Sequence, residues 1–176
     1  MKDFKLFLDL IRIKKPIGIM LLFWPCSWGL TLVNDFSNSY SQYILYLIYF
    51  FLGAILMRSA GCIVNDILDR KYDILVDRTK NRPIASGKIS VSLSLLYVVI
   101  LCSLAFLILI QFNFITILLG LASMPFAFSY PLMKRYTYWP QLFLGFTFNY
   151  GLIMAWFSIK PEFSYIPIIF YIGAIF

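Results

Sequence analysis

The chain alternates long apolar runs with short polar connectors. Five of the runs approach the length of about 20 residues that a helix needs to cross a bilayer. A further run at the end of the sequence holds about fourteen residues and, at about 1.5 Å per residue, is too short to cross. The pattern predicts an all-α, polytopic transmembrane helical bundle of about five full spans and a partial sixth. The full spans are expected at residues 17–33, 43–64, 91–110, 114–130 and 140–159.

The polar segments carry the signals for turns and interfaces. Residues 1–15 alternate Phe, Leu and Ile with Lys, Arg and Asp, which predicts an amphipathic helix in the membrane interface. Pro83 and the pair Ser86-Gly87 predict a loop after Asp77, at the mouth of a site at the end of the second span. Ser90 is a candidate cap for the third span.

The composition is that of a membrane protein. Hydrophobic residues make up 61% of the chain and charged residues 13%, against roughly 45–50% and 25% in soluble domains. The net charge of +7 does not indicate nucleic acid as a partner, because the bases flank apolar runs as topology determinants do. The chain contains no His, which excludes His metal ligands and His general bases.

The bases also predict an orientation. Thirteen of them lie in the N-terminal arm, in residues 70–88 and in the connector after the fourth span, whereas the alternate connectors hold only Lys160. By the positive-inside rule, the N-terminus and the loop after the second span lie on the cytoplasmic side. The chain is therefore expected to cross its membrane several times, with these segments on one side.

The chain's unusual chemistry is concentrated around the end of the second span. If that span continues as a regular helix, four carboxylates fall within about 80° of one another, with Asn65 at their edge. Like charges at this spacing repel, and Mg²⁺, which prefers carboxylate oxygen and substrate phosphates, would remove the repulsion. The face therefore predicts a site for a metal-bound diphosphate. Its acids are Asp66, Asp69, Asp73 and Asp77.

Basic residues near these acids belong to the same hypothesis. Arg78 and Arg82 would contact the remaining phosphate oxygens, because Arg makes bidentate contacts with phosphate. Arg58 lies inside the second span, where a charge is costly and marks a functional or paired residue. Two alternatives stay open at this point. The acids can pair with the chain's own bases at a solvated helix end, and Lys134 and Arg135 can be topology bases alone.

Several stretches together resemble the UbiA-type intramembrane prenyltransferases. The most specific is N-D-x-x-D-x-x-x-D from Asn65, followed by D-R-T-x-x-R-P-x-x-S-G from Asp77. The K-P-I-G and W-P stretches are similar to those of the bacterial 4-hydroxybenzoate polyprenyltransferases of ubiquinone synthesis. The agreeing shorter stretches are K-P-I-G from Lys15, L-L-F-W-P from Leu21, M-R-S-A-G-C from Met57 and Y-P-L-M-K-R from Tyr130.

The resemblance implies a bundle of nine spans, open laterally to membrane lipid for the polyprenyl tail, with Mg²⁺ as cofactor. It also implies a multi-pass location in the bacterial inner (cytoplasmic) membrane, with the active site on the cytoplasmic side. It implies that a polyprenyl group passes from polyprenyl diphosphate to the ring carbon ortho to the hydroxyl of 4-hydroxybenzoate, in ubiquinone biosynthesis. Carried over position by position, the implied roles are metal ligand and catalysis for Asp66, Asp69 and Asp73; diphosphate binding for Asn65, Arg78, Arg82 and Lys134; and catalytic contact with the acceptor or the anion for Arg58 and with the allylic carbon for Tyr130.

One departure from the family pattern changes the expectation for the whole chain. The family's second motif, D-x-x-x-D after the sixth span, has no counterpart, because Glu162 is the only acid after Asp77. Residues 1–176 are expected to form a single integral-membrane prenyltransferase domain that is truncated or split at its C-terminus. The alternatives are an inactive membrane remnant that only binds diphosphate and a UbiA-type enzyme with a different acceptor.

Two other protein classes agree less well with the sequence. A CDP-alcohol phosphatidyltransferase needs D-G-x-x-A-R after its first D-x-x-D, whereas Asp69 is followed by Arg70 and Lys71. A transporter would place its acids near mid-span, between inverted repeats. Here the acids follow a full-length span and no repeat is apparent.

Overall fold

The structure, a computed structural model, describes residues 2–35 and 40–175, with side chains for residues 4–35, 40–133 and 136–175. The described part is helical and contains no β-strand, which confirms the all-α prediction. In chain order the helices are α1 (Lys2–Leu10), α2 (Ile17–Val33), α3 (Tyr40–Leu68), α4 (Arg70–Asp73), α5 (Val91–Leu109), α6 (Phe114–Tyr136), α7 (Pro140–Ile159) and α8 (Ile166–Ile175).

Four helices of the described part are long and apolar enough to cross a membrane. They are α3, α5, α7 and the Phe114–Met133 part of α6. The first predicted span forms as α2, but its 17 residues class it with α8 among the shorter apolar helices. At about 1.5 Å per residue, the 29 residues of α3 reach about 44 Å, more than the hydrocarbon core of about 30 Å. The polar C-terminal turns of α3 therefore extend beyond that core.

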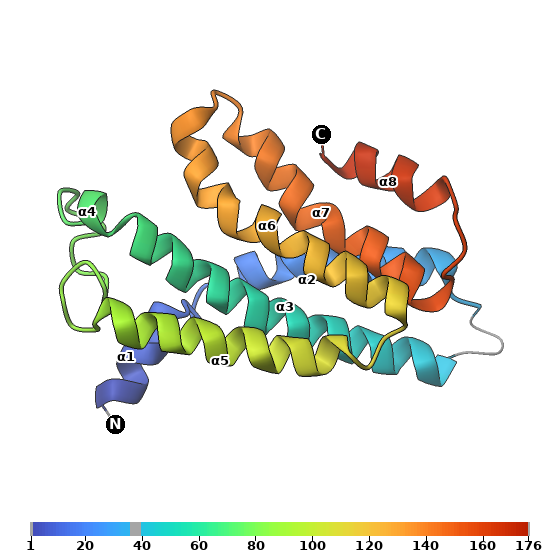
Figure 1. The fold of residues 1–176 in the computed structure, drawn as a ribbon, viewed down its shortest axis with the longest axis horizontal. Helices are drawn as coiled ribbons and strands as arrows, with labels where there is room; N and C mark the ends of the chain where they lie inside the picture. Colours follow the sequence, from blue (N-terminus) through green and yellow to red (C-terminus); the bar gives the residue numbers. More distant parts are fainter. Residues whose placement is uncertain (1, 36–39, 176) are drawn as a thin grey trace.

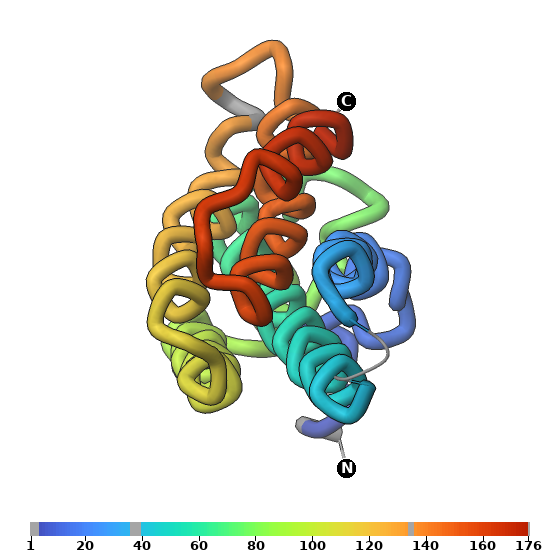
Figure 2. The backbone as a smooth tube through the Cα atoms, turned by 90° about the vertical axis from the view of Figure 1, so that its right-hand side faces the viewer, coloured from blue at the N-terminus to red at the C-terminus, as the bar shows by residue number. Residues whose placement is uncertain are grey.

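Five helices form a ring. Each helix of the ring packs against the next: α2 against α3, α3 against α5, α5 against α6, α6 against α7, and α7 against α2. Figure 1 shows α3 and α5 side by side along the length of the molecule, and Figure 2 shows the ring from its end. The α8 helix packs outside the ring, against α7.

A close approach between α2 and α7 closes the ring. It occurs at Gly29, where a Cβ atom would lie 2.4 Å from the carbonyl oxygen of Leu152 and 3.0 Å from the Cβ of Ala155. Only a residue without a side chain allows the two backbones to come this near. Any larger residue at Gly29 would force α2 away from α7.

The polar segments gather at the two ends of the bundle. Figure 1 shows α1, α4 and the turn between α6 and α7 toward one end, and the turn between α5 and α6 toward the other. The basic segments that the sequence predicted to share a surface are therefore at the same end. Which side of the membrane this end faces stays a prediction.

The α6 helix contains two prolines in its interior, Pro125 and Pro131. Proline has no N–H, so each removes one hydrogen bond from the helix. The carbonyl groups four residues earlier, those of Leu121 and Ala127, lose their usual helical partners. The second half of α6 is thus held by fewer internal hydrogen bonds than an ordinary span.

Asn113 fixes the turn between α5 and α6 to the end of α7. Its Oδ1 accepts a hydrogen bond from the amide of Thr116 at 2.9 Å and caps α6. Its Nδ2 donates to the carbonyl oxygens of Phe157 at 2.7 Å and Ser158 at 3.0 Å. One side chain therefore joins the start of α6 to the end of α7.

Replacing Asn113 with Ala is expected to lower the free energy of unfolding by about 1–3 kcal/mol, because a helix cap and two hydrogen bonds to another helix are lost together. Thermal unfolding of the purified protein in detergent would measure the change. The matched control is Gln111→Ala, since in the described structure the amide of Gln111 donates to the Leu107 carbonyl in the adjacent last turn of α5, at 3.3 Å, and not to another helix. Equal melting temperatures for the two variants would contradict the role of Asn113 as a clamp.

Candidate active site

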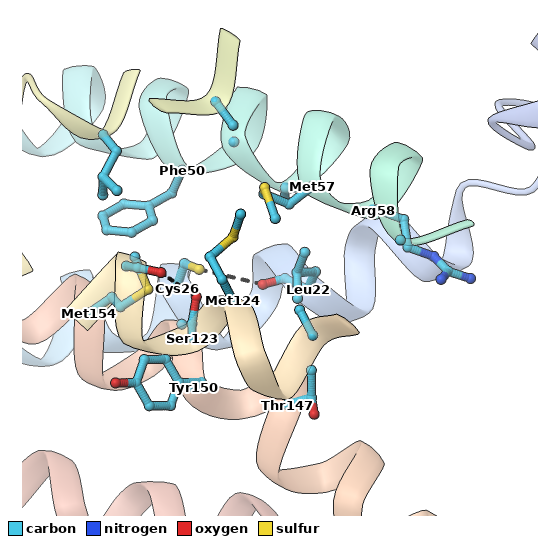
Figure 3. A pocket seen from close by; sticks show the side chains of 18 of the residues that line it. Leu22, Cys26, Phe50, Met57, Arg58, Ser123, Met124, Thr147, Tyr150 and Met154 are labelled. Carbon is cyan, nitrogen blue, oxygen red and sulfur yellow. Dashed lines mark hydrogen bonds between the residues drawn. The ribbon is translucent and has the colours of Figure 1, made fainter. Parts of the chain in front are cut away.

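A mostly apolar cavity of about 220 Å³ lies among the five helices of the ring. Figure 3 shows Phe50 and Arg58 at opposite ends of it, with Met57 between them. Along α3 the lining continues past Arg58 to Asn65, so the stripe from Phe50 to Asn65 extends over about 22 Å. Tyr130 of α6 also lines the cavity. One end of the cavity is thus apolar and the other polar.

Arg58 lies at the polar end between α2 and α7. Its guanidinium carbon is 5.9 Å from the ring centroid of Phe148, a cation–π contact. Gly18 of α2 faces it, and a Cβ at that position would lie 2.3 Å from Nε of Arg58. The absence of a side chain at Gly18 therefore makes room for the arginine. Tyr130, for which the resemblance implies contact with the allylic carbon, is half-buried in the lining of the same cavity.

A buried ion-pair cluster lies at the C-terminal end of α3. The carboxylate of Asp66 is only 3% exposed and pairs with Arg12 and, at 3.3 Å, with Nη1 of Arg82. The same Nη1 donates to Oδ2 of Asp73 at 2.7 Å. One guanidinium thus joins two carboxylates, and a second guanidinium shares one of them.

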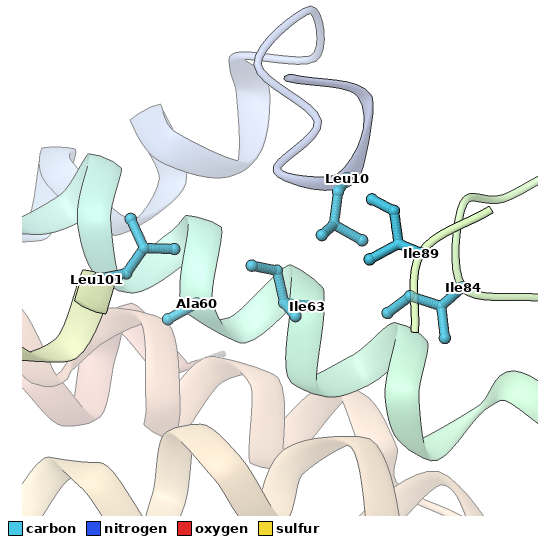
Figure 4. Close-up of a cluster of buried hydrophobic side chains, with 6 residues drawn as sticks. All are labelled: Leu10, Ala60, Ile63, Ile84, Ile89 and Leu101. Atoms are coloured by element: carbon cyan, nitrogen blue, oxygen red, sulfur yellow. The ribbon is translucent and has the colours of Figure 1, made fainter. Parts of the chain in front are cut away.

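Apolar packing holds the segment that delivers Arg82. Figure 4 shows Ile84 and Ile89 of the loop, Leu10 of α1 and Ile63 of α3 pointing toward one another. All four side chains are buried. The loop predicted after Asp77 is therefore anchored against α3 and α1, and this anchoring brings its arginine over the end of α3.

A polar contact fixes the start of the same loop. Thr79 is buried, and its hydroxyl donates to the backbone carbonyl of Asp73 at 3.0 Å. This bond spans six residues and folds the loop back toward α4. The side chain of Asp73 is thereby held within reach of Arg82.

Arg12 is a site residue that the sequence reasoning missed, since it was counted only among the topology bases. Its φ of 56° places it in the left-handed region, which a residue with a side chain adopts at a cost. The turn formed in this way directs its guanidinium to Asp66, 54 positions along the chain. No spacing signal reports a pair so distant in sequence.

Asn65 and Asp69 form a second polar pair beside the cluster. The amide Nδ2 of Asn65 donates to Oδ2 of Asp69 at 3.2 Å. Asn65 also lines the cavity. It is thus the residue of the acidic motif that connects the charged cluster with the apolar cavity.

The prediction of one continuous acidic face was wrong. The α3 helix ends at Leu68, and Asp69 leads into the short α4. The α4 helix ends at Asp73, and Asp77 follows in the loop rather than on a continuing helix, so it does not join the other acids. Its carboxylate is 96% exposed and pairs with Lys80 at 2.7 Å. The cluster is instead built by the fold of the loop.

Two of the predicted diphosphate ligands are not part of this cluster as the structure describes it. Arg78 is exposed on the loop. Lys134 has a backbone within α6, but its side chain lies outside the described residues, as does that of Arg135. Their predicted roles stay predictions.

The oxygen donors are of the kind that Mg²⁺ requires, since carboxylates and an amide carbonyl are hard ligands. Within the described part of the chain, no group of three acidic, His or Cys side chains is close enough to hold a metal ion. Asp66 and Asp73 contact Arg82 through one oxygen each, Oδ1 and Oδ2 respectively. Each carboxylate thus has a second oxygen outside that contact, and the residues suit the metal in chemistry.

The fold and the site define a class of protein: an integral-membrane helical bundle with a mostly apolar cavity that adjoins a buried charged cluster at one end. The comparison with known families narrows this class. The chain belongs to the UbiA prenyltransferase family, whose model matches residues 22–176.

Curated relatives in animals carry a common description. The chain is 42% identical over 162 residues to the mitochondrial 4-hydroxybenzoate polyprenyltransferase of Caenorhabditis elegans, covering 92% of this chain and 45% of the relative. It is 46% identical over 154 residues to those of Rattus norvegicus and Homo sapiens, covering 88% of this chain and 41% of each. The chain thus spans less than half the length of these relatives. They are mitochondrial, whereas the sequence had suggested the bacterial branch.

Solved structures share the fold at low sequence identity. A digeranylgeranylglyceryl phosphate synthase studied in membranes matches with a TM-score of 0.75 and 19% identity, covering 99% of this chain and 59% of that one. A UbiA homologue from Archaeoglobus fulgidus, bound to DMAPP and Mg²⁺, matches with a TM-score of 0.68 and 19% identity, covering 96% and 58%. These likenesses confirm the helical fold.

Proposed function

We propose that this chain contributes the donor site of an enzyme that transfers a polyprenyl group from polyprenyl diphosphate to 4-hydroxybenzoate, at the ring carbon ortho to the hydroxyl, in ubiquinone biosynthesis. The observation that carries the proposal is the junction at Asn65, where the cluster of Asp66, Arg82 and Asp73 adjoins the apolar cavity. A diphosphate at the cluster would direct its tail into the cavity. The names of the curated relatives support the choice of acceptor.

Arginine and lysine would hold the diphosphate. Arg82 already lies at the cluster, and Arg78 and Lys134 are the further candidates on the same end of the bundle. When the bond between the allylic carbon and the diphosphate oxygen breaks, the electron pair leaves with the diphosphate. Fixed positive groups stabilise the negative charge that develops there.

Mg²⁺ is the cofactor in this proposal, with Asp66, Asp69 and Asp73 as its ligands and Asn65 beside them. When bound, it would neutralise phosphate oxygens and lower the energy of the leaving group. The Mg²⁺ in the Archaeoglobus relative supports this assignment at the level of the family. Chelation with EDTA is therefore expected to abolish transfer, and added Mg²⁺ to restore it.

The polar end of the cavity would bind the acceptor and shield the allylic carbon. The electron-rich face of Tyr130 suits a developing carbocation, and the apolar lining keeps out water that would consume it. Arg58 would pair with the carboxylate of the acceptor or with the anion. The ring carbon would then bond to the allylic carbon and pass its proton to the released diphosphate anion, which restores the aromatic ring.

The decisive experiment is transfer in lipid nanodiscs. Purified protein would be incubated with geranyl diphosphate, Mg²⁺ and labelled 4-hydroxybenzoate, and the prenylated product separated and identified. Product that depends on Mg²⁺ supports the proposal. Donor binding without product would favour a diphosphate-binding remnant, and product only with another phenol would favour a different acceptor.

The proposal makes a prediction for Gly18, which leaves room for Arg58. Gly18→Ala is expected to raise the KM for 4-hydroxybenzoate about ten- to a hundred-fold, because the added Cβ displaces the guanidinium. The KM for the donor should change less. The control is Gly173→Ala in α8, where an added Cβ meets no neighbour. Equal values of the acceptor KM in both variants would contradict the placement of Arg58.

The charge pattern supports an orientation. We place α1, α4 and the loop after it on the cytoplasmic side of the membrane, because the bases are concentrated in these segments. The similarity of the K-P-I-G and W-P stretches to bacterial enzymes supports a bacterial inner membrane as that membrane, whereas the curated animal relatives are mitochondrial. We treat residues 1–176 as a single integral-membrane domain, and the closed ring of packed helices supports that treatment. Labelling of cysteines introduced at Lys80 and Gln111 by an impermeant reagent would test the orientation, since the two positions should react from opposite sides.

A further inference from the structure

We propose that Phe112 limits the length of the polyprenyl tail that the cavity accepts. The inference rests on the proposed function, because it assumes that the diphosphate binds at the polar end. Phe112 and its neighbours Phe50 and Cys26 form the end wall of the cavity. A tail that reaches this wall must stop or turn aside toward lipid.

The direction of the cavity supports this assignment. Arg58 lies toward its polar end and Phe50 at the other, as Figure 3 shows. The two residues are eight positions apart on α3, which corresponds to about 12 Å along the helix. The space between them has room for a short isoprenoid tail beyond a head group at the charged cluster.

The apolar end of the cavity is closed by packed side chains. Phe50, Phe112 and Cys26 line the cavity and also belong to a buried cluster with Leu30 and Ala155. Beyond Phe50, Phe112 and Cys26, as seen from the cavity, there is therefore packed core rather than open space. The end wall is one layer of side chains between the cavity and this core.

Aromatic contacts hold the Phe112 ring in place. Its centroid lies 4.9 Å from that of Phe50, 4.9 Å from that of Tyr46 and 5.8 Å from that of Tyr49. The ring is 8% exposed. Each such ring pair stabilises the packed arrangement by about 0.5–1.5 kcal/mol, in addition to the free energy gained by burying the rings. The ring is therefore a fixed stop rather than a mobile side chain.

The backbone that carries Phe112 is also fixed. Phe112 lies in the turn between α5 and α6, next to Asn113, which bonds to the end of α7. With this backbone fixed, the ring can leave the wall only by changing its side-chain rotamer, which would break its contacts with Phe50, Tyr46 and Tyr49. The clamp at Asn113 thus makes the position of the wall a property of the whole ring of helices.

Gly53 provides a second way to change the length of the cavity. It lies on α3 between Phe50 and Arg58, lines the cavity, and a Cβ added to it would meet no atom within 4 Å. A larger side chain at this position would fill open space instead of displacing its neighbours. Gly53→Leu should therefore shorten the cavity while leaving the packing intact.

The test compares farnesyl with geranyl diphosphate as donors for protein in lipid nanodiscs, by transfer rate and by competition binding. Phe112→Ala is expected to raise the farnesyl-to-geranyl ratio about tenfold, and Gly53→Leu to lower it about tenfold, since each changes the room for roughly one isoprene unit. The matched control is Phe114→Ala, because the ring of Phe114 is 72% exposed two positions away. It should leave the ratio unchanged.

The outcomes separate this inference from the proposed function. An unchanged ratio in Gly53→Leu would overturn the length limit, whether or not Phe112→Ala folds. A shift in Phe114→Ala equal to that in Phe112→Ala would also overturn it. If the unsubstituted protein neither binds nor transfers either donor, the proposed function itself fails.

Discussion

Replacing Asp66 with Asn is expected to reduce prenyl transfer about a thousand-fold. The carboxylate of Asp66 is buried at the end of α3 and is shared by Arg12 and Arg82. Asn keeps the shape of the side chain but removes the negative charge, so Mg²⁺ loses a proposed ligand. The two guanidinium groups also lose a counter-charge. The measurement is kcat at saturating donor over a range of Mg²⁺ concentrations.

Asp77→Asn is the matched control for this change. It is the same substitution eleven positions later in the same acidic stretch, but its carboxylate is exposed and contacts only Lys80 in the described structure. Its kcat should equal that of the unsubstituted protein. Thermal unfolding of both variants would report whether loss of the buried charge also destabilises the fold, as breaking a buried ion pair does. A similar kcat for the two variants would show that Asp66 has no role in prenyl transfer.

Replacing Arg82 with Lys is expected to reduce transfer about a hundred-fold while changing the melting temperature little. Nη1 alone makes both contacts, with Asp66 and with Asp73. The other guanidinium nitrogens are the ones that would bind diphosphate oxygens. The ammonium group of Lys can keep the contacts with both carboxylates. It has no second nitrogen that could donate hydrogen bonds to the phosphate at the same time.

The comparison variant is Arg70→Lys, since Arg70 is exposed on α4 and close to the same end of the bundle. It should leave both activity and melting temperature unchanged. Donor affinity from competition binding would separate the two roles of Arg82. A large drop in melting temperature together with normal donor affinity would mean that Arg82 is structural.

Much of the fold could be predicted from the sequence, because apolar runs of this length form helices in any membrane protein. The caps at Ser90 and Asn113 formed where polar residues precede such runs, although only the first was predicted. The loop after Asp77 was predicted from Pro83 and Gly87, and Gly87 indeed adopts a positive φ of 73°. Local signals of this kind need no knowledge of packing.

The arrangement of the charged cluster could not be predicted in the same way. The angular argument assumed an unbroken helix, whereas α3 ends at Leu68 and the loop brings Arg82 back to Asp66. The pairing of Arg12 depends on a left-handed residue in a turn after α1. Both features arise from contacts between segments far apart in the chain, and a periodicity within one segment carries no information about them.

The prolines of α6 have a consequence for how firmly the wall of the cavity is held. Pro131 and the two residues whose carbonyls lose helical partners, Leu121 and Ala127, all line the cavity. This wall can bend outward at less enthalpic cost than α3 or α7, whose hydrogen-bond ladders are uninterrupted by proline. Amide deuterium exchange that is faster around Pro125 than along α3 would show that α6 is the part of this wall that opens most readily.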